Sequence, residues 1–469
     1  MIAPIKPEKL QNSPGAAAAP RAVALDLVSA VLRKGRLLDE ALAPKERISG
    51  GDSGLDSPGG ALDGLSSRDR AFVRLLVTTV LRRLGQVDAV IGHYLERPLP
   101  RQAAESHDIM RLGAAQLLFL KTPPHAAVDT AVEMTRARGF TPHLKLVNAV
   151  LRRMSREGAA LVETQDAPRL NTPDWLWESW TAAYGEEMTR AIATVHLAEP
   201  PLDLSVADNP QAWAERLGGA VLPTGTVRLA NTARVTEMEG FAEGKWWVQD
   251  AAASLPAQIL MSAMASGETE TAGPVLDLCA APGGKTLQLA SGGAHVTALD
   301  RSRPRLARLK DNLSRMNLEA KIVCADAVTW RPQTPAQAVL LDAPCTATGG
   351  LRRHPDVARL KIPDDVSRLA ALADSLLDAA VEMLAPGGRL VFCTCSLEPQ
   401  EGPQRAAALL QRARGMKLAP IEPTEIGGVD GGLSEAVTEE GYLRTLPCHL
   451  PGQGGMDGFF AARFEKAQE

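Results

Sequence analysis

Two short stretches of the sequence carry cysteines where a thiol could do chemistry. The stretch "FCTCS" ends an apolar run and holds Cys393 and Cys395, and "LLDAPC" places Asp342 three residues before Cys345. A thiol in such a position can be a nucleophile, a metal or redox ligand, or small apolar packing. On a strand, Cys393 and Cys395 would share a face yet lie too far apart to bridge easily. Because the six cysteines contain no CxxC pair, we expect no metal site.

A third stretch, "CAAPGGKT" at residues 279–286, has the composition of a loop that holds a cofactor. It ends in Gly-Lys-Thr like a phosphate-binding P-loop, but Cys279 stands where that pattern requires glycine. Small residues let a ligand approach the backbone, and Asp300, one strand later, can accept hydrogen bonds from ribose hydroxyls. Both NAD and S-adenosylmethionine contain a ribose. The absence of the GxGxxG pattern of nicotinamide cofactors favours S-adenosylmethionine.

The elements that must position these residues lie in a C-terminal zone, residues 246–467. Short apolar runs alternate there with helical stretches, and this alternation predicts a Rossmann-like α/β domain, a parallel sheet with helices on both faces. The runs are residues 274–280, 295–300, 321–327, 338–344 and 389–396. Ligands of such sheets bind beyond the carboxyl ends of the strands. Four acidic residues are expected near those ends: Asp277, Asp300, Asp326 and Asp342.

The N-terminal part of the chain has a different pattern. After a tail that we expect to be disordered (residues 1–19), residues 20–157 repeat apolar side chains at helical spacing. Gly35 is a typical helix stop, and Ser66 three residues before Asp69 is typical of a helix start. These signals predict an all-α bundle of five or six short helices.

The bundle carries a surplus of basic residues. Residues 20–160 contain about 21 Lys and Arg against about 15 Asp and Glu, although the whole chain has a net charge of −4. Seven arginines could meet nucleic-acid phosphates: Arg68, Arg70, Arg74, Arg82, Arg83, Arg152 and Arg153. The alternative is a packing or dimerisation module whose charges form a solvated face.

Residues 165–245 between these zones predict a small α+β connector. Trp175, Trp177 and Trp180 lie close together there, and such a cluster is more typical of a core than of a surface that stacks on bases. At 469 residues, with 45% hydrophobic and 23% charged residues, the chain should form two or three globular domains. It contains no run of about 18 apolar residues and no secretory signal, so we expect a cytoplasmic protein with reduced thiols.

Taken together, the motifs resemble a known family. "CAAPGGKT", "LLDAPC" and "FCTCS", in this order and spacing, are similar to the motifs of the Nol/Nop/Sun family of RNA cytosine-C5 methyltransferases, and "DGFFAARF" extends the resemblance through the C-terminal zone. Residues 20–157, through "LSSRDRAFVRLLVTTVLRRLG" and "VNAVLRRM", resemble the NusB family, an all-helical RNA-binding fold. The resemblance implies a multidomain enzyme that uses S-adenosylmethionine to methylate carbon 5 of a cytosine in 16S rRNA.

The chemistry of such a reaction explains a need for cysteine. Carbon 5 of cytosine is a poor nucleophile, so a thiolate must first add to carbon 6. Cys345 and Cys395 both lie at expected strand ends, and the residues alone do not rank them. The resemblance implies that Cys395 is the nucleophile and that Cys345 assists product release. Asp342 is placed to hydrogen-bond cytosine N3 and favour the addition.

The resemblance also implies a set of cofactor contacts. Lys285 could instead be a surface lysine at a helix start, but its place after the Gly-Gly turn favours a contact with cofactor or substrate. The implied cofactor-binding residues are Cys279, Ala280, Ala281, Pro282, Gly283, Gly284 and Lys285 of the loop, with Asp300 on the ribose, Asp326 near the adenine amine, and Asp342 between cofactor and base.

The sequence departs from the family pattern at a few positions. The usual Pro-Cys-Ser-Gly-Thr-Gly is "PCTATG" here, with Thr346 and Ala347 in place of the small pair. Ala373 and Gly402 stand where glutamine and asparagine are common. We expect these changes to leave the chemistry intact and to affect how the RNA is positioned.

Two other functions compete with this interpretation. A catalytically inactive RNA-binding protein could act in antitermination or ribosome assembly, but it would not need both cysteines and all four aspartates. An enzyme that methylates an exocyclic nitrogen would need an Asn/Asp-Pro-Pro-Tyr strand end, where this chain has "DAPC". We therefore expect an active enzyme with RNA as its partner, no membrane association and a monomeric state.

Overall fold

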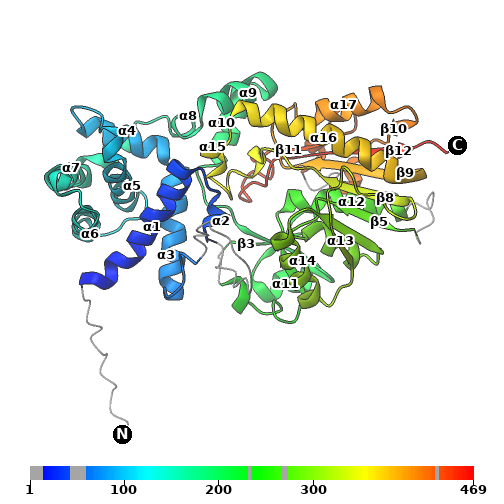
Figure 1. Cartoon of the computed structure of the whole chain (residues 1–469), viewed down its shortest axis with the longest axis horizontal. Helices are drawn as coiled ribbons and strands as arrows, with labels where there is room; N and C mark the ends of the chain where they lie inside the picture. The colour runs from blue at the N-terminus through cyan, green and yellow to red at the C-terminus, as the bar shows by residue number, and fades with distance from the viewer. Residues whose placement is uncertain (1–13, 43–59, 231–233, 266–272, 428–431, 469) are drawn as a thin grey trace, which may run out of the picture. The chain divides into compact units, whose positions relative to one another are not determined.

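The computed structural model describes residues 14–42, 60–230, 234–265, 273–427 and 432–468 (Figure 1). The chain divides into two compact units. The first contains the described residues up to Pro173 together with His354–Leu360, and the second contains Asp174–Arg353 and Lys361 to the C-terminus. Most of the tail predicted for residues 1–19 lies outside the described residues, although helix α1 already begins at Pro14.

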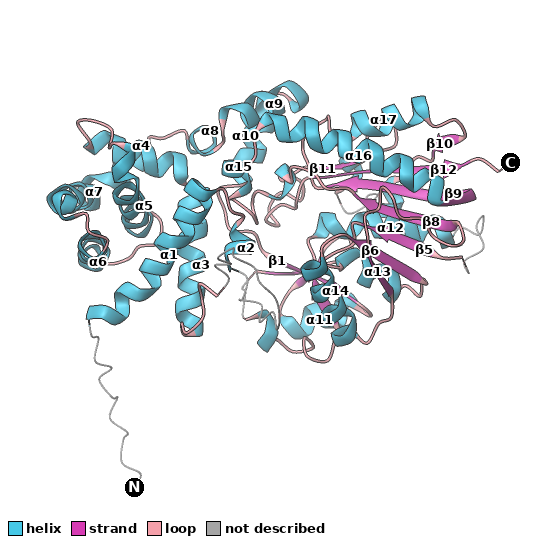
Figure 2. Cartoon of the chain, viewed as in Figure 1, coloured by secondary structure: helices cyan, strands magenta, loops and turns pink. Residues whose placement is uncertain are grey.

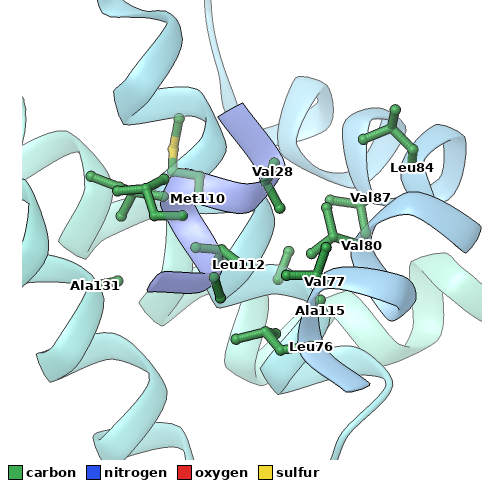
Figure 3. Close-up of a cluster of buried hydrophobic side chains, with 14 of the residues drawn as sticks. Val28, Leu76, Val77, Val80, Leu84, Val87, Met110, Leu112, Ala115 and Ala131 are labelled. Carbon is green, nitrogen blue, oxygen red and sulfur yellow. The ribbon is translucent and has the colours of Figure 1, made fainter. Parts of the chain in front are cut away.

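The first unit is the predicted helical bundle. Ser66 caps one helix as expected, because its hydroxyl accepts the Asp69 amide at 3.2 Å, and α1 ends just before Gly35, whose φ is +65°. Figure 3 shows Val28, Val77 and Leu112, from three different helices, in one apolar cluster. The helices are α1 (Pro14–Lys34), α2 (Leu38–Leu42), α3 (Ser67–Arg82), α4 (Leu84–Tyr94), α5 (Ala104–Leu118), α6 (Pro124–Ala137), α7 (Leu144–Glu163), α8 (Ala167–Asn171) and α15 (Val357–Leu360).

A short segment from far along the chain completes this unit. The Asp356 carboxylate accepts the Leu38 amide at 2.9 Å, and Arg359 Nη2 donates to the Asn171 carbonyl at 2.7 Å. His354 Nδ1 lies 3.5 Å from the Asp39 carboxylate. The segment that follows the Cys345 loop therefore belongs by its contacts to the helical bundle, which local sequence patterns did not predict.

The second unit begins with a small α+β part, as predicted. Its four-stranded antiparallel sheet has the order β2-β3-β1-β4. Trp180 is fully buried and its Nε1 donates to Glu398 at 2.9 Å, so the core interpretation is confirmed for this tryptophan. The elements are α9 (Asp174–Tyr184), α10 (Glu186–Val195), β1 (Leu202–Val206), α11 (Pro210–Leu217), β2 (Ala220–Val221), β3 (Val227–Leu229) and β4 (Trp246–Val248).

The large sheet of the second unit has the order β10-β12-β9-β8-β5-β6-β7, with β11 beside β12. The five predicted strands are present and mutually parallel: β5 (Val275–Leu278), β6 (Val296–Asp300), β7 (Lys321–Cys324), β8 (Ala336–Asp342) and β9 (Leu384–Thr394). The predicted parallel arrangement of these five strands is confirmed, and "DGFFAARF" adds a strand that the sequence did not predict, antiparallel beside β9. This strand is β12 (Phe459–Lys466), which also pairs antiparallel with β10 (Met416–Leu418) and β11 (Leu443–Thr445).

Helices cover both faces of this sheet (Figure 2). On β8, Leu340 packs in the cluster of α12 (Ala251–Ala265), whereas Leu341 packs in the cluster of α16 (Pro363–Met383) and α17 (Pro403–Arg412). This alternation buries consecutive residues on opposite sides and explains why the strands are continuously apolar. Two further helices, α13 (Gly284–Ser291) and α14 (Arg303–Met316), follow β5 and β6. Across the described ranges, no helix is long and apolar enough to cross a membrane.

Candidate active site

The predicted site residues gather where the parallel strands end. Asp300 and Asp342 are the last residues of β6 and β8, Asp326 follows β7 by two residues, and Cys395 directly follows β9. Asp342 is the register partner of Cys393. Because the parallel strands share one direction, these residues lie along one edge of the sheet.

The two cysteines that the sequence could not rank are in contact. Cys345 Sγ lies 3.5 Å from Cys395 Sγ, although the residues are 50 positions apart. The pKa of Cys345 is raised well above its ordinary value, first by its hydrogen bond with Cys395 and then by burial. Either thiol can be the donor in this contact, so the S–H group of Cys345 can donate toward the Cys395 sulfur.

Of the roles that the sequence left open for Cys393, packing inside β9 is the one that fits the structure. Its side chain is fully buried, and burial raises its pKa well above the ordinary value. Its thiol lies 3.6 Å from Asp342 Oδ1, a contact that supports the carboxylate from one side. The protonated, buried thiol of Cys393 is unsuited to act as a nucleophile.

Asp342 is paired with Lys285. Lys285 Nζ donates to Asp342 Oδ2 at 2.8 Å and lies 4.9 Å from the centroid of the Phe459 ring. Burial alone would lower the pKa of Lys285, but the adjacent carboxylate of Asp342 raises it above the ordinary value. Lys285 is only 8% exposed, so the surface interpretation of this lysine was wrong. The Asp342 side chain is 32% exposed and can reach a ligand.

The loop between β5 and α13 fits a cofactor that contains a ribose. Gly283 has a φ of +110°, and a Cβ there would lie 2.2 Å from Leu309 Cδ1, so glycine alone fits. Asp300 accepts the amides of Ala281 at 3.2 Å and Ser302 at 2.8 Å, and this ties the loop to the end of β6. Asp300 Oδ2 also lies 3.6 Å from Arg305 Nη1, whereas Oδ1 keeps a second lone pair that can accept from a sugar hydroxyl. Asp326, which accepts the amide of Val328 at 2.9 Å, is exposed.

Asp277 lies inside β5 rather than at its end. Its Oδ2 accepts the Thr286 hydroxyl of α13 at 2.6 Å, and the side chain is fully buried. Burial raises the pKa of Asp277 to about 7. This aspartate joins the strand to the helix beneath the loop, which is a structural role.

Arg352 and Arg353, which follow the Cys345 loop, lie in a buried ionic network. Arg352 Nε donates to Asp457 at 2.6 Å and its Nη2 to Asp250 at 2.5 Å, while Arg353 Nη2 donates to Asp250 at 2.6 Å. Arg228 and Asp203, paired at 2.7 Å, continue the network into the small sheet. Sequence reasoning missed both Asp250 and Asp457; the one available signal was the acidic residue at the start of "DGFFAARF".

Two buried glutamates on the loop after β9 were also missed. Glu401 accepts the Thr346 amide at 2.9 Å and the Ser396 hydroxyl at 2.5 Å. Glu398 accepts Trp180 Nε1 at 2.9 Å and the Ser179 hydroxyl, which connects the loop to α9. The sequence "SLEPQEG" carries these acids, but nothing in it indicates that they are buried.

Comparisons with known proteins agree with this geometry. The model of the family described as 16S rRNA methyltransferase RsmB/F matches residues 261–465, and that of the NusB family matches residues 18–156. The ribosomal RNA small subunit methyltransferase B of Vibrio cholerae is 34% identical over 419 residues, which are 85% of this chain and 90% of that protein. The chain belongs to the 16S rRNA methyltransferase RsmB/F family.

Other similar proteins span nearly the same length. The ribosomal RNA small subunit methyltransferase B of Xanthomonas campestris is 36% identical over 425 residues, 87% of this chain and 91% of that protein. The solved structure of PH0851 superimposes with a TM-score of 0.68 at 22% identity and covers 96% of this chain and 99% of that one. This second likeness supports the two-part fold.

Two departures from the RsmB/F-type motifs have structural counterparts. Ala347, which replaces a glycine of the usual pattern, has a φ of +58°, a conformation that favours glycine. At Gly402, which replaces an asparagine, a Cβ would lie 2.8 Å from Phe460 Cγ. Glycine at 402 thus leaves room for Phe460. Over the ranges that the structure describes, no group of three or more His, Cys, Asp or Glu side chains is placed to hold a metal ion.

Proposed function

We propose that the protein methylates carbon 5 of a cytosine in 16S rRNA with S-adenosylmethionine as the methyl donor. The observation that carries this proposal is the pair of thiols, Cys345 and Cys395, with sulfur atoms 3.5 Å apart at the carboxyl edge of the sheet. Methylation at carbon 5 needs a thiolate that adds to carbon 6 and later leaves. Membership in the RsmB/F family and the names of the similar proteins support rRNA as the substrate.

Cys395 is the nucleophile in this proposal. The S–H group of Cys345 can donate to the Cys395 sulfur and stabilise negative charge there, which favours attack by Cys395 on carbon 6. After methyl transfer and loss of the carbon-5 proton to a base, the bond between sulfur and carbon 6 breaks and its electron pair returns to Cys395. The same S–H group of Cys345 then donates to the leaving thiolate and assists release.

Asp342 and Lys285 face the developing charge on the base. Addition at carbon 6 makes cytosine N3 more basic, so N3 takes up the proton that the Cys395 thiol gives up, and the Asp342 carboxylate accepts a hydrogen bond from the resulting N3–H and favours this step. The ammonium of Lys285, 2.8 Å from Asp342, holds the carboxyl in place and is a source of positive charge beside it. Both side chains come from elements of the same sheet edge, the end of β8 and the start of α13.

The cofactor is assigned to the loop between β5 and α13. Cys279 to Lys285 would surround it, Asp300 would accept from the ribose hydroxyls, and Asp326 and Asp342 would lie toward the adenine and the base. S-adenosylmethionine supplies an electrophilic methyl group when bound. The left-handed Gly283 and the small side chains before it keep the backbone accessible for this ligand.

The remaining parts of the chain have proposed roles in substrate binding. We assign residues 20–157 to an RNA-binding domain whose seven arginines contact phosphates, residues 165–245 to a connector, and residues 246–467 to the methyltransferase domain. The protein is proposed to act as a monomer in the cytoplasm on 16S rRNA or its precursor. The assembled pair of thiols favours an active enzyme over an inactive RNA-binding protein.

A labelling experiment tests the function. The full-length protein is incubated with S-adenosylmethionine carrying a tritiated methyl group and with unmethylated 16S rRNA, and the RNA is digested to nucleosides. We expect the label in 5-methylcytidine, no label with Cys395→Ala, and normal labelling with Cys448→Ala, whose thiol lies near Met188 outside the site. Label in an N-methylated nucleoside, or equal labelling by Cys395→Ala, would overturn the proposal.

A further inference from the structure

The side chain of Glu401 bridges the two loops that carry the thiols. Its Oε1 accepts the amide of Thr346 at 2.9 Å, and its Oε2 accepts the hydroxyls of Thr346 and Ser396, each at 2.5 Å. Thr346 directly follows Cys345, and Ser396 directly follows Cys395. One carboxylate thus holds the residue next to each thiol.

The bridge is buried and reinforced by neighbouring hydrogen bonds. Glu401 is only 1% exposed, so water cannot readily replace its partners. The Gly349 amide donates to the Cys395 carbonyl at 2.9 Å, and the Leu397 amide donates to the Thr348 hydroxyl at 3.0 Å. These contacts close the two loops against each other, with Glu401 as the charged group of the set.

The two loops depend on Glu401 to different extents. The Cys395 loop has further supports, since Arg444 Nη1 donates to the Ser396 carbonyl at 2.6 Å and Tyr184 donates to the Leu397 carbonyl. The Cys345 loop is also tied at its two ends, where the Ala343 amide donates to the Cys393 carbonyl at 3.0 Å and the Gly458 amide donates to the Gly349 carbonyl at 2.9 Å. Next to Cys345 itself, Thr346 makes two of the three hydrogen bonds to Glu401. Loss of the carboxylate should therefore displace Cys345 more than Cys395.

The negative charge of Glu401, like its hydrogen bonds, favours a Cys345 thiol that can donate to the Cys395 sulfur. Three donors converge on its carboxylate, which favours the ionised form, although burial raises its pKa above the ordinary value. A negative charge at this place helps to keep the Cys345 thiol protonated, after the larger effects of the Cys395 contact and burial. The S–H group of Cys345 stays available as a donor.

We propose that Glu401 is a positioning residue that holds Cys345 beside Cys395 for the release of the methylated base. The inference rests on the proposed function, in which the bond between the Cys395 sulfur and carbon 6 breaks as the S–H group of Cys345 donates to the leaving thiolate. Without Glu401, addition by Cys395 still takes place, although with less help from the Cys345 S–H group, while release is slowed more strongly. A covalent complex between protein and RNA then accumulates with both cysteines present.

The test follows this complex during turnover. Full-length Glu401→Gln, which keeps the size of the side chain but loses one acceptor oxygen, is incubated with S-adenosylmethionine and unmethylated 16S rRNA, and covalent complexes are counted on a denaturing gel. We expect at least about 5-fold more complex than with the wild-type protein. We also expect kcat to fall about 10- to 100-fold with little change in KM, as for a misplacement of about 1 Å in a site.

Control variants separate positioning from general damage. Glu398→Gln changes another buried glutamate of the same loop, whose carboxylate contacts Ser179 and Trp180 of α9 and also Thr348, rather than Thr346 or Ser396, so it should accumulate much less complex than Glu401→Gln. Thr346→Val removes one hydroxyl donor and leaves the backbone amide, so it should give a smaller accumulation. If Glu401→Gln does not fold, Thr346→Val decides the question alone.

The outcomes distinguish this inference from the proposed function. Accumulation with Cys345→Ala but not with Glu401→Gln or Thr346→Val would overturn the role of Glu401 and leave the assignment of the thiols intact. Absence of any complex with Cys345→Ala would overturn the assignment of the thiols themselves. Equal accumulation of the covalent complex with Glu398→Gln would show that Glu401 has no specific role in positioning Cys345, and this would also refute the inference.

Discussion

The carboxyl edge of the large sheet has two halves that are built differently. At the ends of β5 and β6, a loop of consecutive small residues is shaped by Gly283 and tied by the backbone amides that Asp300 accepts. At the ends of β8 and β9, the loops with Cys345 and Cys395 are held by buried charged side chains from distant parts of the chain. A cofactor loop can be specified by one continuous stretch of sequence. Two thiols in contact instead need side chains from distant parts of the chain to hold their loops together.

The largest expected effect is a loss of stability in the half at the ends of β8 and β9, which we call the thiol half, after substitution of Arg352. Arg352→Ala leaves the carboxylates of Asp250 and Asp457 buried with fewer cationic partners, so it should lower the free energy of unfolding by about 3–5 kcal/mol. Denaturant unfolding of the full chain measures this loss. Arg353→Ala, whose side chain is 19% exposed, is the matched control and should cost less. A loss under about 1 kcal/mol for Arg352→Ala would refute the idea that ion pairs hold the Cys345 loop.

The half at the ends of β5 and β6, which we call the cofactor half, should make the free energy of unfolding depend on pH because of Asp277. Because its folded-state pKa is raised to about 7 from an ordinary value of 3.8, the folded protein keeps a proton that the unfolded chain loses between these values. The free energy of unfolding should therefore fall as pH rises from about 4 to 7. Asp277→Asn removes this dependence, and relative to the wild type it should gain about 2–4 kcal/mol on going from pH 4 to pH 8.

Unfolding curves of both proteins at several pH values check this expectation. Asp311→Asn, an exposed position on α14, is the control for the loss of a charge. Parallel pH profiles for the wild type and Asp277→Asn would show that Asp277 is not the group that titrates. The buried charge of Asp277 would then not contribute to the pH dependence of stability at the ends of β5 and β6.

The smallest expected effect concerns the backbone of the Cys345 loop. Ala347 has a left-handed φ of +58°, which costs about 1 kcal/mol for a residue with a Cβ. Ala347→Gly should therefore raise the free energy of unfolding by about 0.5–1 kcal/mol, less the greater freedom of glycine in the unfolded chain. Thermal unfolding measures the change. A lower Tm would indicate that the methyl group of Ala347 makes a favourable contact that outweighs the conformational cost.

Much of the fold could be predicted because its signals are local. The apolar runs at residues 274–280 and 338–344 became β5 and β8 since each buries consecutive side chains on two faces of the sheet. The helix start at Ser66 was predicted from a single capping residue. The antiparallel return of β12 was missed, because a strand carries no local signal for the direction of its neighbour.

The site could be predicted only in part, for the same reason. The residues at the strand ends were found from motifs, but the contact between Cys345 and Cys395 joins positions 50 residues apart. Arg352 donates to Asp250, which lies about 100 residues earlier in the chain, and no local pattern indicates this pairing. Polar groups buried by such distant pairing leave no periodic pattern in the sequence.

The central claim is that Cys395 attacks the base and Cys345 assists its release. The most direct measurement incubates Cys345→Ala and Cys395→Ala with S-adenosylmethionine and unmethylated 16S rRNA, followed by a denaturing gel. We predict a covalent complex with RNA for Cys345→Ala and none for Cys395→Ala. A complex that forms only with Cys395→Ala would contradict the assignment and make Cys345 the nucleophile.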